Sequence, residues 1–314
     1  MKNKFSILIR LALGILIIIL LLSKMNLYEI KRLFFSIRPF PFLLAIISFT
    51  IGILLSTYRW KILADVQKTP SNFKDLFKVY LASLFLGNIL PSGGLDIARA
   101  VYLSRATGKR SHSFASVMVD RLLGVFAIFS FVIFGFMLGM SKLEPIRGIF
   151  LVSLLTFFLV IILLLTDKVH SIIHKILIKI PFGDRALRLY DALFFYRNEP
   201  KALVLSFLIS LLIQFSFVVV ALFDAMALSF SLPIISTLVY VTTINFLAMI
   251  PVTLSGIGIR EGGFVLFFTP FIGKEASLTL SILYYLTGVL VSFIGGGILL
   301  LGKEKIRLEE SLEE

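Results

Sequence analysis

The sequence predicts an all-α polytopic membrane protein, with about six full transmembrane helices and two re-entrant helical hairpins in an inverted-repeat arrangement. Three observations predict this class: an excess of apolar residues, a series of apolar runs of helical length, and the interruption of two of these runs by proline and glycine. Hydrophobic residues make up 58% of the 314 residues and charged residues only 16%, against roughly 25% charged residues in ordinary soluble domains. The chain therefore lacks the polar residues that a soluble surface requires.

Uninterrupted apolar runs predict the helices that cross the bilayer completely. A helix needs about 20 residues to cross the roughly 30 Å hydrocarbon core. We expect the first run to remain as an uncleaved span, because no small-residue cleavage site of a signal peptide follows it. The full spans are expected near residues 5–22, 42–57, 116–138, 148–165, 202–228 and 276–301.

Two further runs predict helices that enter the membrane and turn back. Residues 73–90 and 234–250 each end in a break that contains proline and glycine. Each break is followed by a shorter apolar segment, at residues 95–103 and 259–269. Proline and glycine interrupt helices, and irregular backbone at membrane depth is tolerated only where protein or a polar cavity satisfies it. We therefore expect two re-entrant hairpins.

The distribution of lysine and arginine supports hairpins that turn back. If both interrupted runs are re-entrant, the segments at one face of the membrane hold 21 Lys and Arg and those at the other face hold 7. If every run crosses instead, the inner segments hold 12 and the outer segments 16. Since cytosolic segments are enriched in Lys and Arg, the re-entrant arrangement is favoured. It places both termini in the cytosol and the chain in the cytoplasmic membrane.

The chain is expected to form one transmembrane domain over residues 1–314, without a soluble domain. The order of spans and hairpins recurs in the opposite orientation, which is an architecture of transporters. A first inverted repeat is expected at about residues 5–140 and a second at about residues 148–301. Residues 302–314 are expected to form a charged cytosolic tail.

Charged residues at membrane depth cost several kcal/mol and are functional candidates for that reason. The first hairpin brings Asp96 and Arg99, which lie one helical turn apart, and the next span brings Asp120 and Arg121. One expected arrangement pairs Asp120 with Arg99 and leaves Arg121 free for a ligand. The alternative is a structural cluster of salt bridges that locks the hairpin in place.

The second hairpin brings Arg260 and Glu261 next to a glycine-rich turn at the start of a helix. Such a turn presents unpaired N–H groups and a positive dipole end, which suit an anion such as a phosphate. Asp224 is a weaker candidate, expected near the outer end of its span and hydrated. The predicted substrate-binding residues are Asn88, Gly93, Gly94, Asp96, Arg99, Asp120, Arg121, Asn245, Gly256, Gly258, Arg260 and Glu261.

Signals for other kinds of function are weak. The chain has no cysteine, which excludes disulfides and thiolate metal sites. His170 and His174 have a spacing that can bind metal, but they lie in an amphipathic surface helix expected at residues 168–180, without a third ligand. A similar surface helix is expected at residues 27–37. We expect no enzyme activity, no metal and no cofactor, and no nucleic-acid partner, because the Lys and Arg are spread between apolar runs.

Three segments resemble the lysylphosphatidylglycerol synthase transmembrane region, a flippase-like family of membrane proteins also called UPF0104. They are residues 88–99 (NILPSGGLDIAR), 119–124 (VDRLLG) and 256–262 (GIGIREG). The resemblance covers about residues 5–301 and departs from the family pattern where Leu95 precedes the aspartate. It implies the lipid-moving part of that family, without the soluble aminoacyl-transfer domain of its full-length synthases.

The functional hypothesis is a lipid translocator of the flippase or scramblase type, which moves a phospholipid or lipid-linked headgroup between leaflets through a polar cavity lined by the hairpins. Its expected partners are membrane lipids, above all anionic phospholipid, and a homo-oligomer is compatible with the sequence. The first alternative is a transporter of a small soluble anionic solute. The others are a non-transporting membrane partner protein and an enzyme acting on lipid at the interface.

Overall fold

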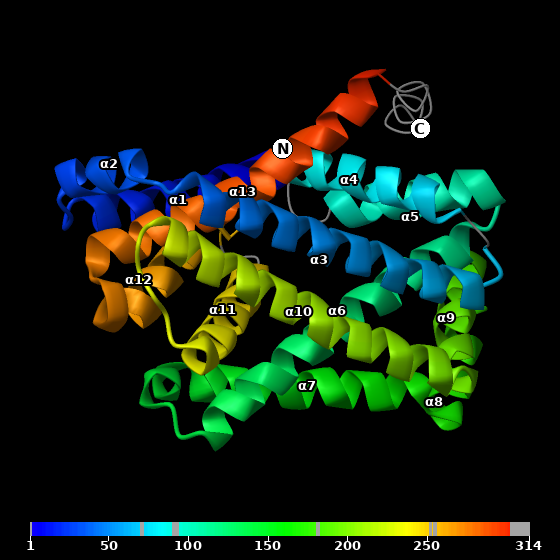
Figure 1. Ribbon diagram of the computed structural model, residues 1–314. Coiled ribbons are helices and arrows are strands. Elements are labelled where there is room, and N and C mark those ends of the chain that lie inside the picture. The colour runs from blue at the N-terminus through cyan, green and yellow to red at the C-terminus, as the bar shows by residue number, and fades with distance from the viewer. Residues whose placement is uncertain are drawn as a thin grey trace.

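The computed structural model describes residues 2–69, 72–89, 94–179, 183–250, 253 and 256–301. Over these residues the regular secondary structure is helical, and no strand occurs among them. Figure 1 shows that most of the long helices run in roughly the same direction and lie side by side. The predicted all-α polytopic membrane fold is confirmed.

Five helices are long and apolar enough to cross a membrane, and a sixth span is counted if residues 12–22 and helix α2 (Leu27–Phe35), bent by 95°, are taken together. Asn26 begins α2, because its side-chain oxygen accepts hydrogen bonds from the N–H groups of Tyr28 and Glu29 at 3.0 and 3.4 Å. This count agrees with the predicted number of spans. After α1 (Lys2–Leu22), the long helices are α3 (Pro39–Val66), α6 (Arg110–Met137), α7 (Arg147–Leu165), α10 (Pro200–Ala227) and α13 (Lys274–Leu301).

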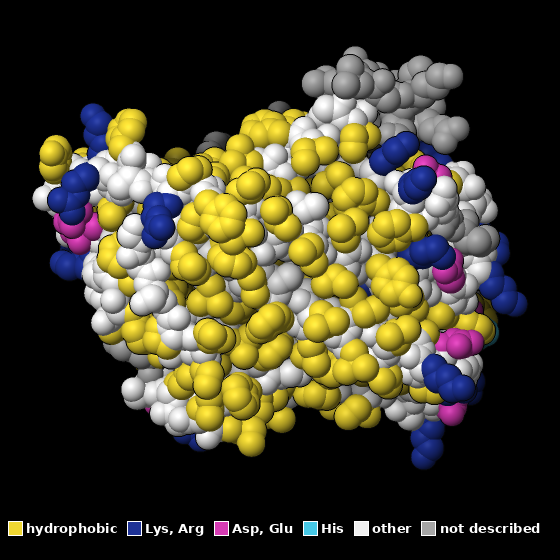
Figure 2. All heavy atoms as spheres, in the orientation of Figure 1, with side chains coloured by type: hydrophobic (Ala, Val, Ile, Leu, Met, Phe, Trp, Pro, Cys, Tyr) yellow, Lys and Arg dark blue, Asp and Glu magenta, His cyan; other side chains and the backbone are white. Residues whose placement is uncertain are grey.

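An apolar belt covers the middle of the molecule. Figure 2 shows hydrophobic side chains across the middle of the visible face, with Lys, Arg, Asp and Glu side chains gathered toward its two ends. Ile47 of α3 and Leu208 of α10, for example, are 46% and 52% exposed. Side chains of this kind are stable in hydrocarbon and costly in water. The shared direction of the long helices is therefore the direction in which the chain crosses the bilayer.

Two short helices, α8 (Asp167–Leu177) and α9 (Gly183–Phe195), lie at one end of the long helices (Figure 1). Helix α8 falls within the predicted surface helix, whereas α9 was not predicted and packs against α6. The hydroxyl of Tyr196, just after α9, donates a hydrogen bond to the carbonyl oxygen of Leu63 at 2.7 Å. Burial raises the pKa of Tyr196, which keeps this group a donor. We call this the α9 end and the opposite one, where α2 lies, the α2 end.

The two interrupted runs form helical hairpins that enter from opposite ends. Figure 1 shows the first pair of helices reaching in from the α9 end and the second from the α2 end, each turning back near the middle. The first turn, residues 90–93, lies outside the described residues, and residues 253 and 256–258 of the second turn are described. The hairpins are α4 (Phe73–Ile89) with α5 (Gly94–Thr107), and α11 (Ile234–Met249) with α12 (Ile259–Ile272).

The helix packing repeats when the two halves of the chain are exchanged. The exchange relates α3 to α10, the first hairpin to the second, and α6 to α13. The contact of α4 with α13 then matches that of α11 with α6, and the contact of α5 with α6 matches that of α12 with α13. Helices α3 and α10, which exchange with each other, form the most extensive helix contact. An inverted repeat predicts this pattern. Its limits at about residues 5–140 and 148–301 stay a prediction.

Helix α13 lies against both hairpins. Gly295 of α13 approaches α4 so closely that a Cβ atom at this position would lie 2.0 Å from the carbonyl oxygen of Leu81. At Gly296, a Cβ atom would lie 2.8 Å from the ring of Phe85. Small residues permit such backbone contact between membrane helices. The first hairpin is therefore held directly against the backbone of α13.

Candidate functional site

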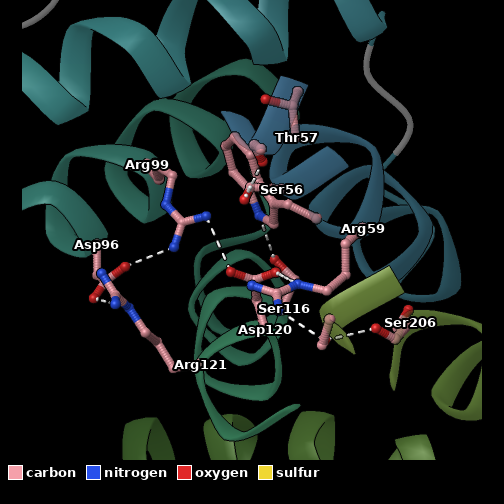
Figure 3. A network of polar contacts seen from close by, with 12 residues as sticks. Ser56, Thr57, Arg59, Asp96, Arg99, Ser116, Asp120, Arg121 and Ser206 are labelled. Atoms are coloured by element: carbon pink, nitrogen blue, oxygen red, sulfur yellow. Dashed lines mark hydrogen bonds and ion pairs between the residues drawn. The ribbon is translucent and has the colours of Figure 1, made fainter. Parts of the chain in front are cut away.

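A buried ionic network joins the first hairpin to α3 and α6 (Figure 3). At its centre the carboxylate of Asp120 accepts hydrogen bonds from Arg59 Nε at 2.7 Å and from Arg99 Nη1 at 3.2 Å. The side chains of Asp120 and Arg99 are 1% and 0% exposed. Removing charges from water costs several kcal/mol per ion, so full burial demands this close pairing. The predicted Asp120–Arg99 pair is confirmed.

Asp96 extends the network toward the surface. Its two carboxylate oxygens accept from Arg99 Nη2 and from Arg121 Nε, both at 2.6 Å. The side chain of Asp96 is 24% exposed and that of Arg121 is 48% exposed. The expectation that Arg121 has no protein partner is therefore wrong, because the first turn of α5 places Asp96 between the two guanidinium groups.

Arg59 belongs to the network, although it is not among the predicted site residues. Helix α3 continues to Val66, beyond the predicted end at residue 57, and this carries Arg59 into the helical bundle. Its Nη1 atom donates to the hydroxyl of Ser210 on α10 at 2.8 Å. The signal that could have placed it is the run that follows Arg59, which contains no helix breaker before residue 66.

The network carries an excess of positive charge. It joins the three arginines described above to two aspartates, which gives these five side chains a formal charge of +1. Arg99 also lies over the rings of Trp60 and Tyr80, with its guanidinium carbon 5.1 and 4.7 Å from their centroids. Arg99 Nε is buried without a hydrogen-bond partner among the described residues. Of the three arginines, Arg121 is the one that is largely accessible.

The second hairpin places Arg260 and Glu261 at the start of α12. Glu261 Oε2 accepts from the N–H of Gly258 at 2.6 Å, and Glu261 Oε1 accepts from Arg260 Nη2 at 3.2 Å. The carboxylate of Glu261 thus occupies the helix N-terminus that the sequence analysis assigned to an anion. The guanidinium carbon of Arg260 lies 4.1 Å from the ring centroid of Tyr285 on α13.

The glycines of the second turn are required by its backbone and by α1. Gly256 and Gly258 have φ angles of 73° and 86°, in the region that favours glycine. A Cβ atom on Gly258 would lie 2.9 Å from the side chain of Ile17 and 3.0 Å from the carbonyl oxygen of Gly14. Both glycines therefore shape the turn, and Gly258 also allows α1 to cover it, so their roles are structural.

Both predicted asparagines join a hairpin to α13. Asn88 Nδ2, near the end of α4, donates to the hydroxyl of Ser292 at 2.9 Å. Asn245 of α11 interacts with the side chain of Tyr284. Of the predicted glycines in the first turn, Gly93 lies outside the described residues and Gly94 is the first residue of α5.

The two halves place different side chains at equivalent positions. Helices α6 and α13 both have 28 residues. Counted from the first residue of each helix, Asp120 and Arg121 correspond to Tyr284 and Tyr285. Arg121 pairs with an acid of the first hairpin, whereas Tyr285 stacks on the arginine of the second. Each half thus holds arginine at the contact between its hairpin and its last span, Arg99 and Arg121 in the first half and Arg260 in the second.

Two other polar residues differ from their expected roles. Asp224 is fully buried, so its expected hydration is wrong; α10, which carries it, packs against α11 and α13. A hydrogen bond of 2.9 Å joins His170 Nε2 to Asp191 Oδ1, and the His170 ring stacks on Phe194. Both contacts lie between α8 and α9. His170 serves there as a packing residue.

Fold and site together define a multi-pass membrane protein in which two opposed helical hairpins carry buried or partly buried ion pairs. The sequence profile described as the lysylphosphatidylglycerol synthase TM region matches residues 7–296. The chain belongs to this family.

Two curated relatives are UPF0104 membrane proteins. That of Methanocaldococcus jannaschii is 31% identical over 170 residues, which cover 51% of this chain and 49% of the relative. That of Pyrococcus horikoshii is 28% identical over 137 residues, 42% of this chain and 40% of the relative. The chain thus aligns with about half or less of the length of these relatives.

Proposed function

We propose that this protein moves an anionic phospholipid, or a lipid-linked anionic headgroup, between the leaflets of the cytoplasmic membrane. The observation that carries the proposal is the ionic network of the first hairpin, which has one arginine more than it has aspartates and ends at the accessible Arg121. An anionic headgroup would balance this excess charge. The family supports a lipid substrate, since its description names a phospholipid synthase.

The proposed mechanism is electrostatic and involves no covalent change. A charged headgroup that enters hydrocarbon alone faces a large desolvation cost. An arginine binds a phosphate through two parallel hydrogen bonds, so the phosphate replaces Asp96 as the partner of Arg121. Arg260 is the equivalent cation of the second hairpin. The headgroup passes between these two arginines while the acyl chains stay in the bilayer.

The connecting segments support a proposed orientation of the protein in the membrane. The turn after α3, the turn after α5 and the helices α8 and α9 lie together at the α9 end (Figure 1). Residues 61–78, 105–110 and 168–201, which form these segments and the helix ends next to them, hold 14 Lys and Arg, whereas residues 24–38, 142–147 and 274 hold 7. We place the α9 end in the cytosol for this reason, with the second hairpin entering from the opposite side.

The test is the movement of fluorescent phosphatidylglycerol in vesicles that contain the purified protein. Arg121→Ala and Arg260→Ala are each expected to slow the movement roughly tenfold to a hundredfold, the range that follows from losing one charged hydrogen bond of about 1.5–3 kcal/mol. Arg147→Ala is the control, because Arg147 is 59% exposed and pairs only with Glu144 at the surface.

Unchanged rates in both Arg121→Ala and Arg260→Ala would remove the phosphate role. A vesicle assay with wild-type protein that moves inorganic phosphate but no lipid would instead favour a transporter of a small soluble anion.

A further inference from the structure

Asp224 is a fully buried carboxylate with no cationic partner. Its exposed fraction is 0%, and its side-chain hydrogen bonds come from the hydroxyl of Thr287, at 3.1 Å to Oδ1 and 3.4 Å to Oδ2. It forms no ion pair with any described residue. Asp120, the other fully buried aspartate described, has two arginines. Among the described residues, arginines thus balance one buried aspartate and leave the other without a counter-charge.

The surroundings of Asp224 are apolar. Ala221 and Ala225, one turn before and next to it on α10, belong to the largest buried cluster of the protein. Leu283 of α13 and Phe264 and Phe268 of α12 belong to the same cluster. An isolated carboxylate in such surroundings takes up a proton instead of remaining charged.

The titratable and charged groups around Asp224 come from several helices. Helix α13 contributes Tyr284 and α11 contributes Tyr240, while Arg260 belongs to α12. Arg38, which precedes α3, contacts the end of α10 through its backbone N–H only, which donates to the carbonyl oxygen of Ala227. On the α3 and α6 sides, Arg59 is bound to Asp120. Helix α13 links Asp224 to Arg260, because Thr287 binds the carboxylate and Tyr285, two residues earlier, lies against the guanidinium group of Arg260.

We propose that Asp224 is a proton-binding site that couples proton binding to binding of the anionic headgroup at Arg260. This inference rests on the proposed function. With its proton, Asp224 is neutral, and the headgroup then has to displace only Glu261 from Arg260. Without the proton, the carboxylate attracts Arg260 and competes with the headgroup. Proton and anionic headgroup therefore favour each other's binding, and by linkage each raises the affinity for the other.

The first test detects the proton itself and needs no transport. The full-length protein in lipid nanodiscs is expected to show the infrared absorption of a protonated carboxyl group at neutral pH, and Asp224→Asn is expected to remove it. Asp65→Asn is the matched control, because Asp65 is exposed and pairs with Lys61, and it should leave the band unchanged. Absence of the band in wild-type protein at neutral pH, or its persistence in Asp224→Asn, overturns the inference.

The second test measures coupling. Movement of fluorescent phosphatidylglycerol by wild-type protein is expected to become at least severalfold faster as the pH falls from alkaline to acidic. Asp224→Asn copies the neutral form, so its rate should be high and should not change with pH. A pH dependence that survives in folded Asp224→Asn overturns the coupling. If wild-type protein moves no lipid but shows the carboxyl band, the proposed function fails and the proton site stands.

Discussion

Replacing Asp120 by asparagine is expected to lower the free energy of unfolding by about 3–5 kcal/mol, the cost of removing one partner from a buried charge pair. Asparagine keeps the size of the side chain but loses the negative charge. Arg99 keeps Asp96 as a partner, whereas Arg59 keeps only the hydroxyl of Ser210. Most of the cost therefore arises at Arg59. The measurement is denaturant unfolding of the purified protein in detergent micelles.

The control for this change is Asp65→Asn, which breaks the exposed ion pair between Asp65 and Lys61 on α3. Exposed pairs contribute roughly 0–1 kcal/mol, so this variant should unfold almost as the wild-type protein does. Equal stability of Asp120→Asn and Asp65→Asn would mean that the charges of the network are hydrated, and the network would lose its role in holding the first hairpin.

Replacing Gly295 by alanine is expected to destabilise the protein by about 1–3 kcal/mol or more, as overpacking of a core does. The added Cβ would lie 2.0 Å from the carbonyl oxygen and 2.3 Å from the carbonyl carbon of Leu81. Both are backbone atoms, so α4 must move away from α13. The hydrogen bond between Asn88 and Ser292 should weaken with it. Thermal unfolding in detergent measures the loss.

Gly297→Ala provides the comparison two residues further along the same helix. A Cβ atom at Gly297 would meet nothing within 4 Å. Alanine is a better helix former than glycine by up to about 1 kcal/mol, so this variant should be as stable as wild-type protein or more stable. If both glycine variants lost stability equally, helix propensity or lipid packing would explain the result, and the close contact with α4 would not.

Much of the fold could be predicted, because apolar runs and helix breakers are local signals. The long runs predicted the spanning helices, and the breaks after residues 90 and 250 predicted the hairpins. Helix α9 was not predicted, because it is short and amphipathic and is held by tertiary contacts of side chains such as Tyr190. The predicted end of α3, at residue 57, lies too early in the sequence. A charged residue such as Arg59 is typical of a segment outside the membrane, but here its charge is neutralised inside the bundle.

Four of the five charged residues of the network were predicted, all but Arg59, and their connections were predicted only in part. Asp96 and Arg99 pair through local helix geometry, and that part follows from their spacing. The contacts of Asp120 with Arg59 and of Arg121 with Asp96 join residues that lie far apart in the sequence. Burial of Asp224 could not be inferred either, because it depends on α11 and α13 packing against α10.

The position of α13 constrains how the hairpins can move. Ser292 and Tyr285, which contact the first and second hairpins, are seven residues apart and so lie on the same side of this helix, about 10 Å from each other along its axis. A helix is stiff over this distance. If one hairpin moves, the other must therefore move with it. Otherwise the hydrogen bond between Asn88 and Ser292 or the stacking of Arg260 on Tyr285 must break. The two hairpins, which enter from opposite sides of the membrane, would then move in one concerted event.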